Sequence, residues 1–144
     1  MKSRPKRIWA ICSLLVIVPL LSLLLSTYLF MTNNLPEQLQ LTFYNLSIMF
    51  LLPLALIYSS VMFFLGKPNS HRYTLSLSIA YFGLLIYQNA YLLQIPDLPA
   101  ETASKVTTNI IRSVIEILLV VWVVFSAKTT NFMLEMEKKT EEGS

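Results

Sequence analysis

Arg112 and Glu116 are the residues of this sequence best placed to do chemistry, because both lie within an apolar stretch that runs from Val106 to Ala127. Their spacing of four residues places both side chains on one face of a helix, so we expect them to pair with each other. A buried arginine can bind an anionic group, and a buried carboxyl can take up and release a proton. The pair therefore predicts either a structural lock between helices or a functional site.

Amide side chains from other stretches can reach the level of this pair if the stretches cross a membrane as helices. At the rise of an α-helix, Arg112 lies about 9 Å and Glu116 about 15 Å from the outer membrane boundary. On the same scale Gln88 and Asn89 lie about 10 Å from that boundary, and Asn45 about 6 Å. We expect a polar cluster that frames an outward-facing pocket. Its members are Asn45, Gln88, Asn89, Asn109, Arg112 and Glu116.

Other reactive residue types are too few for the common catalytic and metal sites. The chain has one cysteine, Cys12, and one histidine, His71, so we expect no dithiol pair, no metal and no nucleophile–histidine set. The three glycines do not form a phosphate-binding loop. Glu116 is the one acid within the long apolar stretches, which leaves no carboxylate pair. The sequence therefore predicts no enzyme and no cofactor.

The elements that must position these residues are long apolar stretches. Of the 144 residues 55% are hydrophobic and only 13% are charged, whereas soluble domains carry about 25% charged residues. Four stretches are long enough to cross a hydrocarbon core roughly 30 Å thick as helices. They are residues 8–31, 41–65, 73–95 and 106–127. We expect residues 1–144 to form one all-α domain, an integral membrane four-helix up-down bundle with a tail at 128–144.

Lysine and arginine near the ends of the stretches predict the orientation in the membrane. Four basic residues precede the first stretch, and Lys67 and Arg72 lie in the second loop, whereas the first loop has none. Both termini and the second loop are therefore expected in the cytoplasm. The first stretch is too long for a cleaved signal peptide and lacks a clear cleavage site, so it is interpreted as a membrane anchor. The net charge of +3 reflects this bias and not nucleic-acid binding.

Small residues follow one face of the third stretch. Ser76, Ala80 and Gly83 recur at spacings of four and three residues, which places them on one side of a helix. Small side chains allow another transmembrane helix to approach closely. This face predicts a helix-packing surface, and its partner is either another helix of this chain or a second subunit.

Residues near the ends of the stretches form a further pattern. A tryptophan follows the basic start, Phe63-Phe64 with Lys67 closes the second stretch, and Tyr73 opens the third. Arg112 is followed by Trp122, Ser126-x-Lys128 spans the end of the last stretch, and Phe132 lies just past it. In these positions the chain resembles the YdgK-like family of small four-span bacterial inner-membrane proteins, a domain of unknown function. It departs from that pattern at Ile8, in place of glycine, and at Val123-Val124, in place of proline and tyrosine. The resemblance implies a bacterial inner membrane and an intramembrane arginine at Arg112, and no activity.

Small size, missing catalytic sets and the small-residue face favour a non-enzymatic multi-pass membrane protein that acts through helix–helix contacts. Such a protein is an accessory subunit, a stress-related factor or an immunity-type protein. The alternative is a small solute or proton-coupled pathway through the polar pocket, in which Arg112 binds an anionic group and Glu116 carries a proton. The expected partners are the lipid bilayer and another membrane protein or a second copy of the chain.

Overall fold

The computed structural model describes residues 5–32 and 43–142, and every regular element in these ranges is a helix. The helices are α1 (Lys6–Met31), α2 (Phe43–Phe64), α3 (Ser70–Leu92), α4 (Ala100–Val124) and α5 (Ala127–Glu142). The all-α class is therefore confirmed for the described residues. α3 and α4 begin earlier than the predicted stretches at 73 and 106, because their first turns are polar and hydropathy does not mark them. The predicted tail forms a separate helix, α5.

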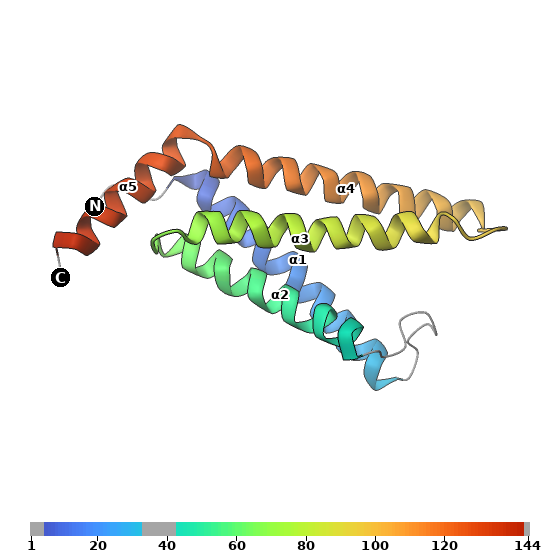
Figure 1. Cartoon of the computed structure of the whole chain (residues 1–144). Coiled ribbons are helices and arrows are strands. Elements are labelled where there is room, and N and C mark those ends of the chain that lie inside the picture. Colours follow the sequence, from blue (N-terminus) through green and yellow to red (C-terminus); the bar gives the residue numbers. More distant parts are fainter. Residues whose placement is uncertain (1–4, 33–42, 143–144) are drawn as a thin grey trace.

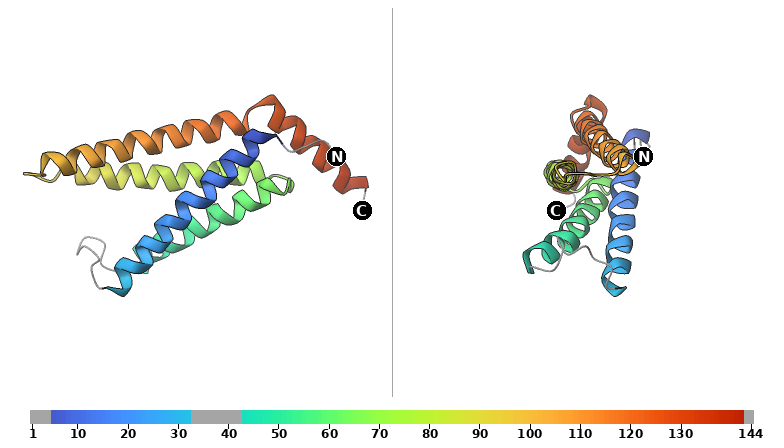
Figure 2. Two further views of the ribbon diagram at one scale, coloured as in Figure 1. Left: turned by 180° about the vertical axis from the view of Figure 1, so that it is seen from behind. Right: turned by 90° about the vertical axis from the view of Figure 1, so that its right-hand side faces the viewer.

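The first four helices form two pairs arranged as a V (Figure 1). α1 packs along α2 and α3 packs along α4, while α2 also contacts α3. The pairs meet at the end that holds the start of α1, the turn 65–69 and the end of α4, which we call the closed end. They diverge toward the open end, where α1 ends at Met31 and α3 ends at Leu92 (Figure 2).

This V corrects the predicted bundle in one respect. Consecutive helices alternate in direction, as an up-down bundle requires, but the two pairs do not stay together along their length (Figures 1 and 2). In the half next to the open end Gln88 and Asn109 are exposed.

The apolar core lies in the half of the molecule next to the closed end. It contains side chains from every described helix. The Arg7 guanidinium lies 4.5 Å from the centroid of the Trp122 ring, a cation–π contact that joins α1 to α4. The buried members of this core are Ile8, Ile11, Cys12, Leu15, Leu56, Phe63, Tyr81, Phe82, Val120, Val123, Val124 and Met133.

The turn between α2 and α3 is a Schellman motif that requires glycine. The Gly66 amide donates to the Phe63 carbonyl at 3.0 Å, and the Lys67 amide donates to the Met62 carbonyl at 3.1 Å. Gly66 has a φ of 73°, a left-handed conformation that other residues adopt at a cost. A Cβ atom at Gly66 would also lie 2.8 Å from the Met136 Cγ atom of α5. The turn therefore uses glycine both for its backbone shape and for the approach of α5.

α5 begins at Ala127, separated from the end of α4 by two residues, and packs on the closed end. Ser126 caps it, since its hydroxyl accepts the Thr129 amide at 3.4 Å. Thr129 and Met133 are buried, whereas Lys138 and Lys139 are exposed, so α5 places one side against the other helices and the other in solvent. The charged tail predicted from residue 128 onward therefore forms a helix up to Glu142.

Two of the described helices are long and apolar enough to cross a membrane, within Lys6–Tyr28 and Ala100–Val124. The described apolar part of α2, Ile48–Phe64, is shorter. The four-span arrangement therefore stays a prediction.

Candidate functional site

Arg112 and Glu116 form the expected ion pair, in which the Arg112 Nε atom donates to the Glu116 Oε1 atom at 2.9 Å. The two side chains differ in burial: that of Glu116 is 7% exposed and that of Arg112 is 61% exposed. The sequence predicts that both face the bundle interior or a wet cavity; Glu116 is buried, whereas Arg112 is largely exposed. Arg112 lies one turn nearer the open end, where α1 and α2 have diverged from α4 (Figure 1). The pair therefore links a buried carboxylate to a guanidinium on the surface of the chain.

Tyr81 of α3 adds a buried hydroxyl to this pair. Its ring packs edge to face against Phe82, with centroids 5.1 Å apart. Ser22 of α1 and Arg112 and Glu116 of α4 influence this hydroxyl electrostatically. That hydroxyl is buried without a well-directed hydrogen bond in the described part of the chain.

Tyr81 was not among the predicted site residues, although its spacing along the sequence indicates its position. Tyr81 precedes the predicted cluster member Gln88 by seven residues, so the two lie on the same side of α3. Ser113 was also missed. It is buried on α4 three residues before Glu116, again on the same side of the helix. The buried polar site therefore combines residues of α1, α3 and α4.

The amide residues of the predicted cluster do not join this site. Gln88 and Asn109 are exposed, and the Asn89 amide donates to the Leu85 carbonyl of its own helix at 2.7 Å. None of these three described side chains forms a hydrogen bond with Arg112 or Glu116. The side chain of Asn45, in α2, lies outside the described residues. The expected amide layer is therefore not assembled by Gln88, Asn89 and Asn109, because the helix pairs diverge at their level.

The predicted small-residue face of α3 is not covered by the chain itself. Ser76 and Ala80 are exposed. A Cβ atom built at Gly83 would meet no atom within 4 Å, so open space surrounds this position. Of the two partners that the sequence left open, another helix of this chain is excluded for these three residues in the described structure.

α3 packs on α2 through a different set of small residues. Thr74 and Ser78 are buried, and the Thr74 hydroxyl donates to the Ser59 carbonyl across the helix pair at 3.0 Å. The Ser78 hydroxyl donates to the Thr74 carbonyl at 2.6 Å. Ser70, Thr74 and Ser78 repeat every four residues, a signal of a helix contact that sequence analysis did not use.

His71 lies in the first turn of α3, at the closed end. Burial and the neighbouring Arg72 lower the pKa of His71, and Glu137 of α5 partly opposes this shift. Among the described residues, no group of three or more histidine, cysteine or acidic side chains could hold a metal ion.

Comparison with known proteins finds no family model that matches the chain, no similar curated protein and no similar solved structure. The resemblance to the YdgK-like family therefore stays a prediction, and the site has to be interpreted from its own geometry.

Proposed function

We propose that this chain is a four-span integral membrane protein that acts by packing the outer face of α3 against another membrane protein chain. Its role would be that of an accessory subunit, a stress-related factor or an immunity-type protein, with no chemistry of its own. The observation that carries the proposal is the uncovered face of Ser76, Ala80 and Gly83, which has open space at its glycine.

The glycine on this face needs an explanation, because glycine in the middle of a helix costs about 0.5–1 kcal/mol relative to alanine. Within the described residues no atom lies within 4 Å of a Cβ position at Gly83. Between helices in lipid, close backbone approach through small residues is a main source of association, since lipid tails are as apolar as the side chains. A helix from a second chain would use this space.

The exterior of the helices supports immersion in lipid. Soluble proteins rarely expose large contiguous apolar surfaces. In this chain many large apolar side chains of α1, α2 and α4 are exposed. They include Ile17, Leu21, Leu24, Leu25, Leu51, Leu54, Ile111, Ile115, Leu118 and Trp122.

Packing supports a membrane position for α2 and α3 as well. Both α1 and α4 have the length and composition of a span. α2 runs beside α1, and α3 runs beside α4 (Figure 1). If α1 and α4 cross a bilayer, α2 and α3 therefore occupy the same depth, which is the predicted four-span arrangement.

The basic residues support an orientation with the closed end in the cytoplasm. Arg7 at the start of α1, Lys67 in the turn and Lys128 at the start of α5 all lie at this end. This distribution follows the positive-inside rule. Together with the resemblance to the YdgK-like family, it makes the bacterial inner membrane our proposed location, with both termini in the cytoplasm.

Cysteine crosslinking in membranes tests the proposed contact. In a Cys12→Ser background, single cysteines replace Ser76, Ala80 or Gly83, and a cysteine at the exposed Leu118 of α4 is the matched control. A short bis-maleimide should trap the same partner, a second copy or a foreign membrane protein, from all three α3 positions. The yield from Leu118 should be several-fold lower. No trapped chain, or equal yield from Leu118, would contradict the proposal.

The polar site supports a second candidate, a proton-coupled or anion pathway. The specific observation is the buried Glu116 carboxylate, which contacts the largely exposed Arg112 guanidinium. The buried Tyr81 hydroxyl lies within electrostatic range of both groups. Such an arrangement offers a proton acceptor inside the helices and a cation that connects it to the exterior. The purified chain in liposomes with an internal pH dye should then carry a proton flux that Glu116→Gln abolishes without loss of folding. A substitution that only lowers stability would identify the pair as a structural lock.

A further inference from the structure

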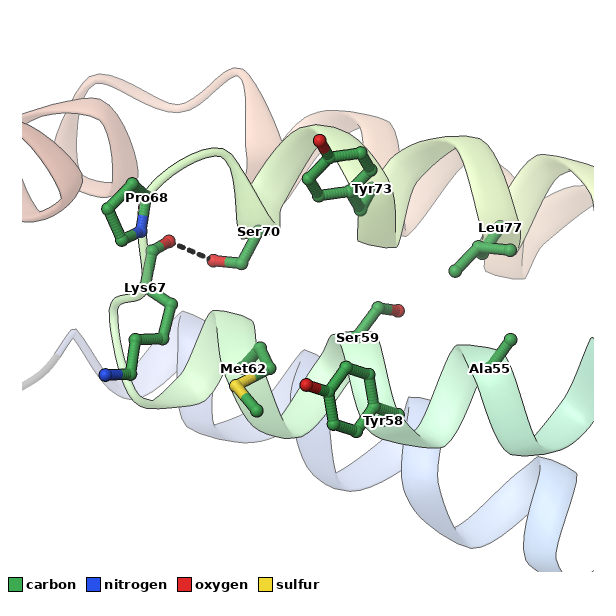
Figure 3. A pocket seen from close by; sticks show the side chains of 9 residues that line it. All are labelled: Ala55, Tyr58, Ser59, Met62, Lys67, Pro68, Ser70, Tyr73 and Leu77. Atoms are coloured by element: carbon green, nitrogen blue, oxygen red, sulfur yellow. Dashed lines mark hydrogen bonds between the residues drawn. The ribbon is translucent and has the colours of Figure 1, made fainter.

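A groove of about 420 Å³ lies between α2 and α3 next to the turn 65–69 (Figure 3). One wall comes from α2 and the other from α3, and the turn closes its cytoplasmic end. Its lining includes Ala55, Tyr58 and Met62 on α2, Tyr73 and Leu77 on α3, and Lys67 in the turn. None of the residues that line this groove belongs to the buried polar site or to the face of Ser76, Ala80 and Gly83.

The length and lining of the groove fit one acyl chain. Ala55 and Leu77 mark its deep end, and the α2 wall runs from Ala55 to Met62. Seven residues of helical rise span about 10 Å. One leaflet is about half of a hydrocarbon core roughly 30 Å thick. In the proposed orientation the groove therefore extends from the cytoplasmic side through most of one leaflet.

The charge at the mouth of the groove selects an anionic head group. Lys67 is exposed there, and no acidic residue lines the groove. Within the described chain Lys67 forms no ion pair with a carboxylate. The Ser70 hydroxyl donates to the Lys67 carbonyl, which fixes the turn that presents the lysine (Figure 3). Arg72 follows on the first turn of α3 and is also exposed.

Two tyrosines stand on opposite walls of the groove, Tyr58 on α2 and Tyr73 on α3 (Figure 3). Tyrosine prefers the boundary between lipid and water, where its ring lies in the apolar region and its hydroxyl meets polar groups. A second cavity, of about 270 Å³ between α1 and α2, has Trp9 and Phe64 in its lining and no charged residue. Only the α2–α3 groove of these two combines an apolar channel with a cation.

We propose that the α2–α3 groove binds one anionic phospholipid of the cytoplasmic leaflet, with its phosphate at Lys67 and one acyl chain between Tyr58 and Leu77. Basic pockets between transmembrane helices on the cytoplasmic side are suited to anionic head groups. The inference rests on the proposed membrane position of the chain. It assigns the closed end a ligand that the protein–protein contact of α3 does not need.

Native mass spectrometry of the full chain in mild detergent tests this inference. Dioleoylphosphatidylglycerol and dioleoylphosphatidylcholine, which differ in head-group charge but not in chains, are added at equal concentrations. The phosphatidylglycerol should bind first. Lys67→Gln should lower this preference about fivefold, the factor expected for one lysine at an anionic surface. Ala55→Phe, which fills the groove, should reduce the binding of both lipids.

Matched controls separate the groove from general effects. Lys105→Gln removes an exposed lysine near the open end, and Val16→Phe fills the second cavity, so both should keep wild-type lipid binding. The inference is overturned if wild type shows no preference, if Lys67→Gln keeps it, if Lys105→Gln loses it equally, or if Ala55→Phe is folded by circular dichroism and binds normally. It also fails if glycerol 3-phosphate competes as well as the lipid, because the acyl groove would then be unused.

Alkaline carbonate extraction of wild-type membranes distinguishes failure of this inference from failure of the proposed function. A chain that stays in the membrane but shows no lipid preference contradicts only the lipid site. A chain that is released contradicts the membrane proposal itself.

Discussion

At the closed end, side chains from several helices bury one another, whereas at the open end the helix pairs have diverged. Phe63 of α2, Ile8 of α1 and Met133 of α5 belong to one buried cluster at the closed end. At the open end Met31 and Tyr91 are exposed. The buried contacts of the described chain are therefore concentrated at the closed end. At the open end exposed apolar side chains remain, which face lipid or a partner chain in the proposed function.

Replacing a core side chain at the closed end should have the largest effect. Phe63→Ala removes a fully buried ring and leaves a cavity. We expect a loss of about 3 kcal/mol in the free energy of unfolding, the lower part of the range for buried phenylalanines, because only packing is lost in lipid or detergent. Tyr91→Ala at the open end should change it by less than about 0.5 kcal/mol. Unfolding of the purified chain in mixed detergent measures both, and equal losses would contradict the comparison.

The two helix-associated glycines should respond in opposite directions. Gly66→Ala at the closed end forces a left-handed φ on alanine and pushes a Cβ atom against Met136, so we expect a loss of about 2 kcal/mol. Gly83→Ala meets open space within a helix, so the isolated chain should gain about 0.5–1 kcal/mol. The same unfolding assay measures both changes.

The Gly83→Ala variant also tests the proposed contact of α3 with a partner chain. Gly83→Ala should stabilise the isolated chain and lower the crosslinking yield from the α3 face, because the methyl group occupies space that the partner would use. Unchanged crosslinking with unchanged partner identity would show that this face is not the contact.

The two ion pairs of α4 offer the next comparison. Arg112→Gln leaves the buried Glu116 carboxylate without its partner, and we expect a loss of about 1 kcal/mol, kept small because Arg112 itself is largely exposed. Lys105→Gln breaks a pair with Glu101 in which both side chains are more than two-thirds exposed, and its effect should be close to zero. Chemical unfolding at low and high salt checks both values. An equal effect of the two substitutions would show that burial of Glu116 does not matter.

Much of the fold was predictable because apolar runs and helix spacing are local properties. The stretches at 8–31 and 41–65 anticipate α1 and α2, and the four-residue spacing of Arg112 and Glu116 anticipates their ion pair. The exposure of Arg112 was not predictable in this way. It depends on the divergence of the helix pairs, which is a property of the whole arrangement.

Gln88, Asn89 and Asn109 do not form the predicted amide layer for a related reason. Depth along a helix axis placed Gln88 and Asn89 near Arg112, but depth does not determine whether two helices are close at that level. Asn89 instead bonds to Leu85 on its own helix, a local choice that a single sequence does not reveal. The four-residue repeat of Ser70, Thr74 and Ser78 is visible in the sequence. The face of Ser76, Ala80 and Gly83 is equally regular, so spacing alone does not show which of the two packs on α2.

Acidification should have the smallest effect, and it should act on the closed end alone, because the chain's one histidine lies there. Burial and Arg72 lower the pKa of His71 below 6.5, and Glu137 partly raises it. The unfolded chain therefore binds the proton more readily than the folded one. The stabilisation is fully present above about pH 6.5 and is lost as the pH falls through the lowered pKa of the folded state.

The midpoint of thermal unfolding, measured between pH 5 and 8, tests this linkage. It should decrease slightly on the acid side in wild type. His71→Gln should remove this contribution. Glu137→Gln should enlarge it, because without the nearby carboxylate the pKa of His71 falls further. An identical acid slope in His71→Gln and wild type would place the pH response elsewhere in the molecule.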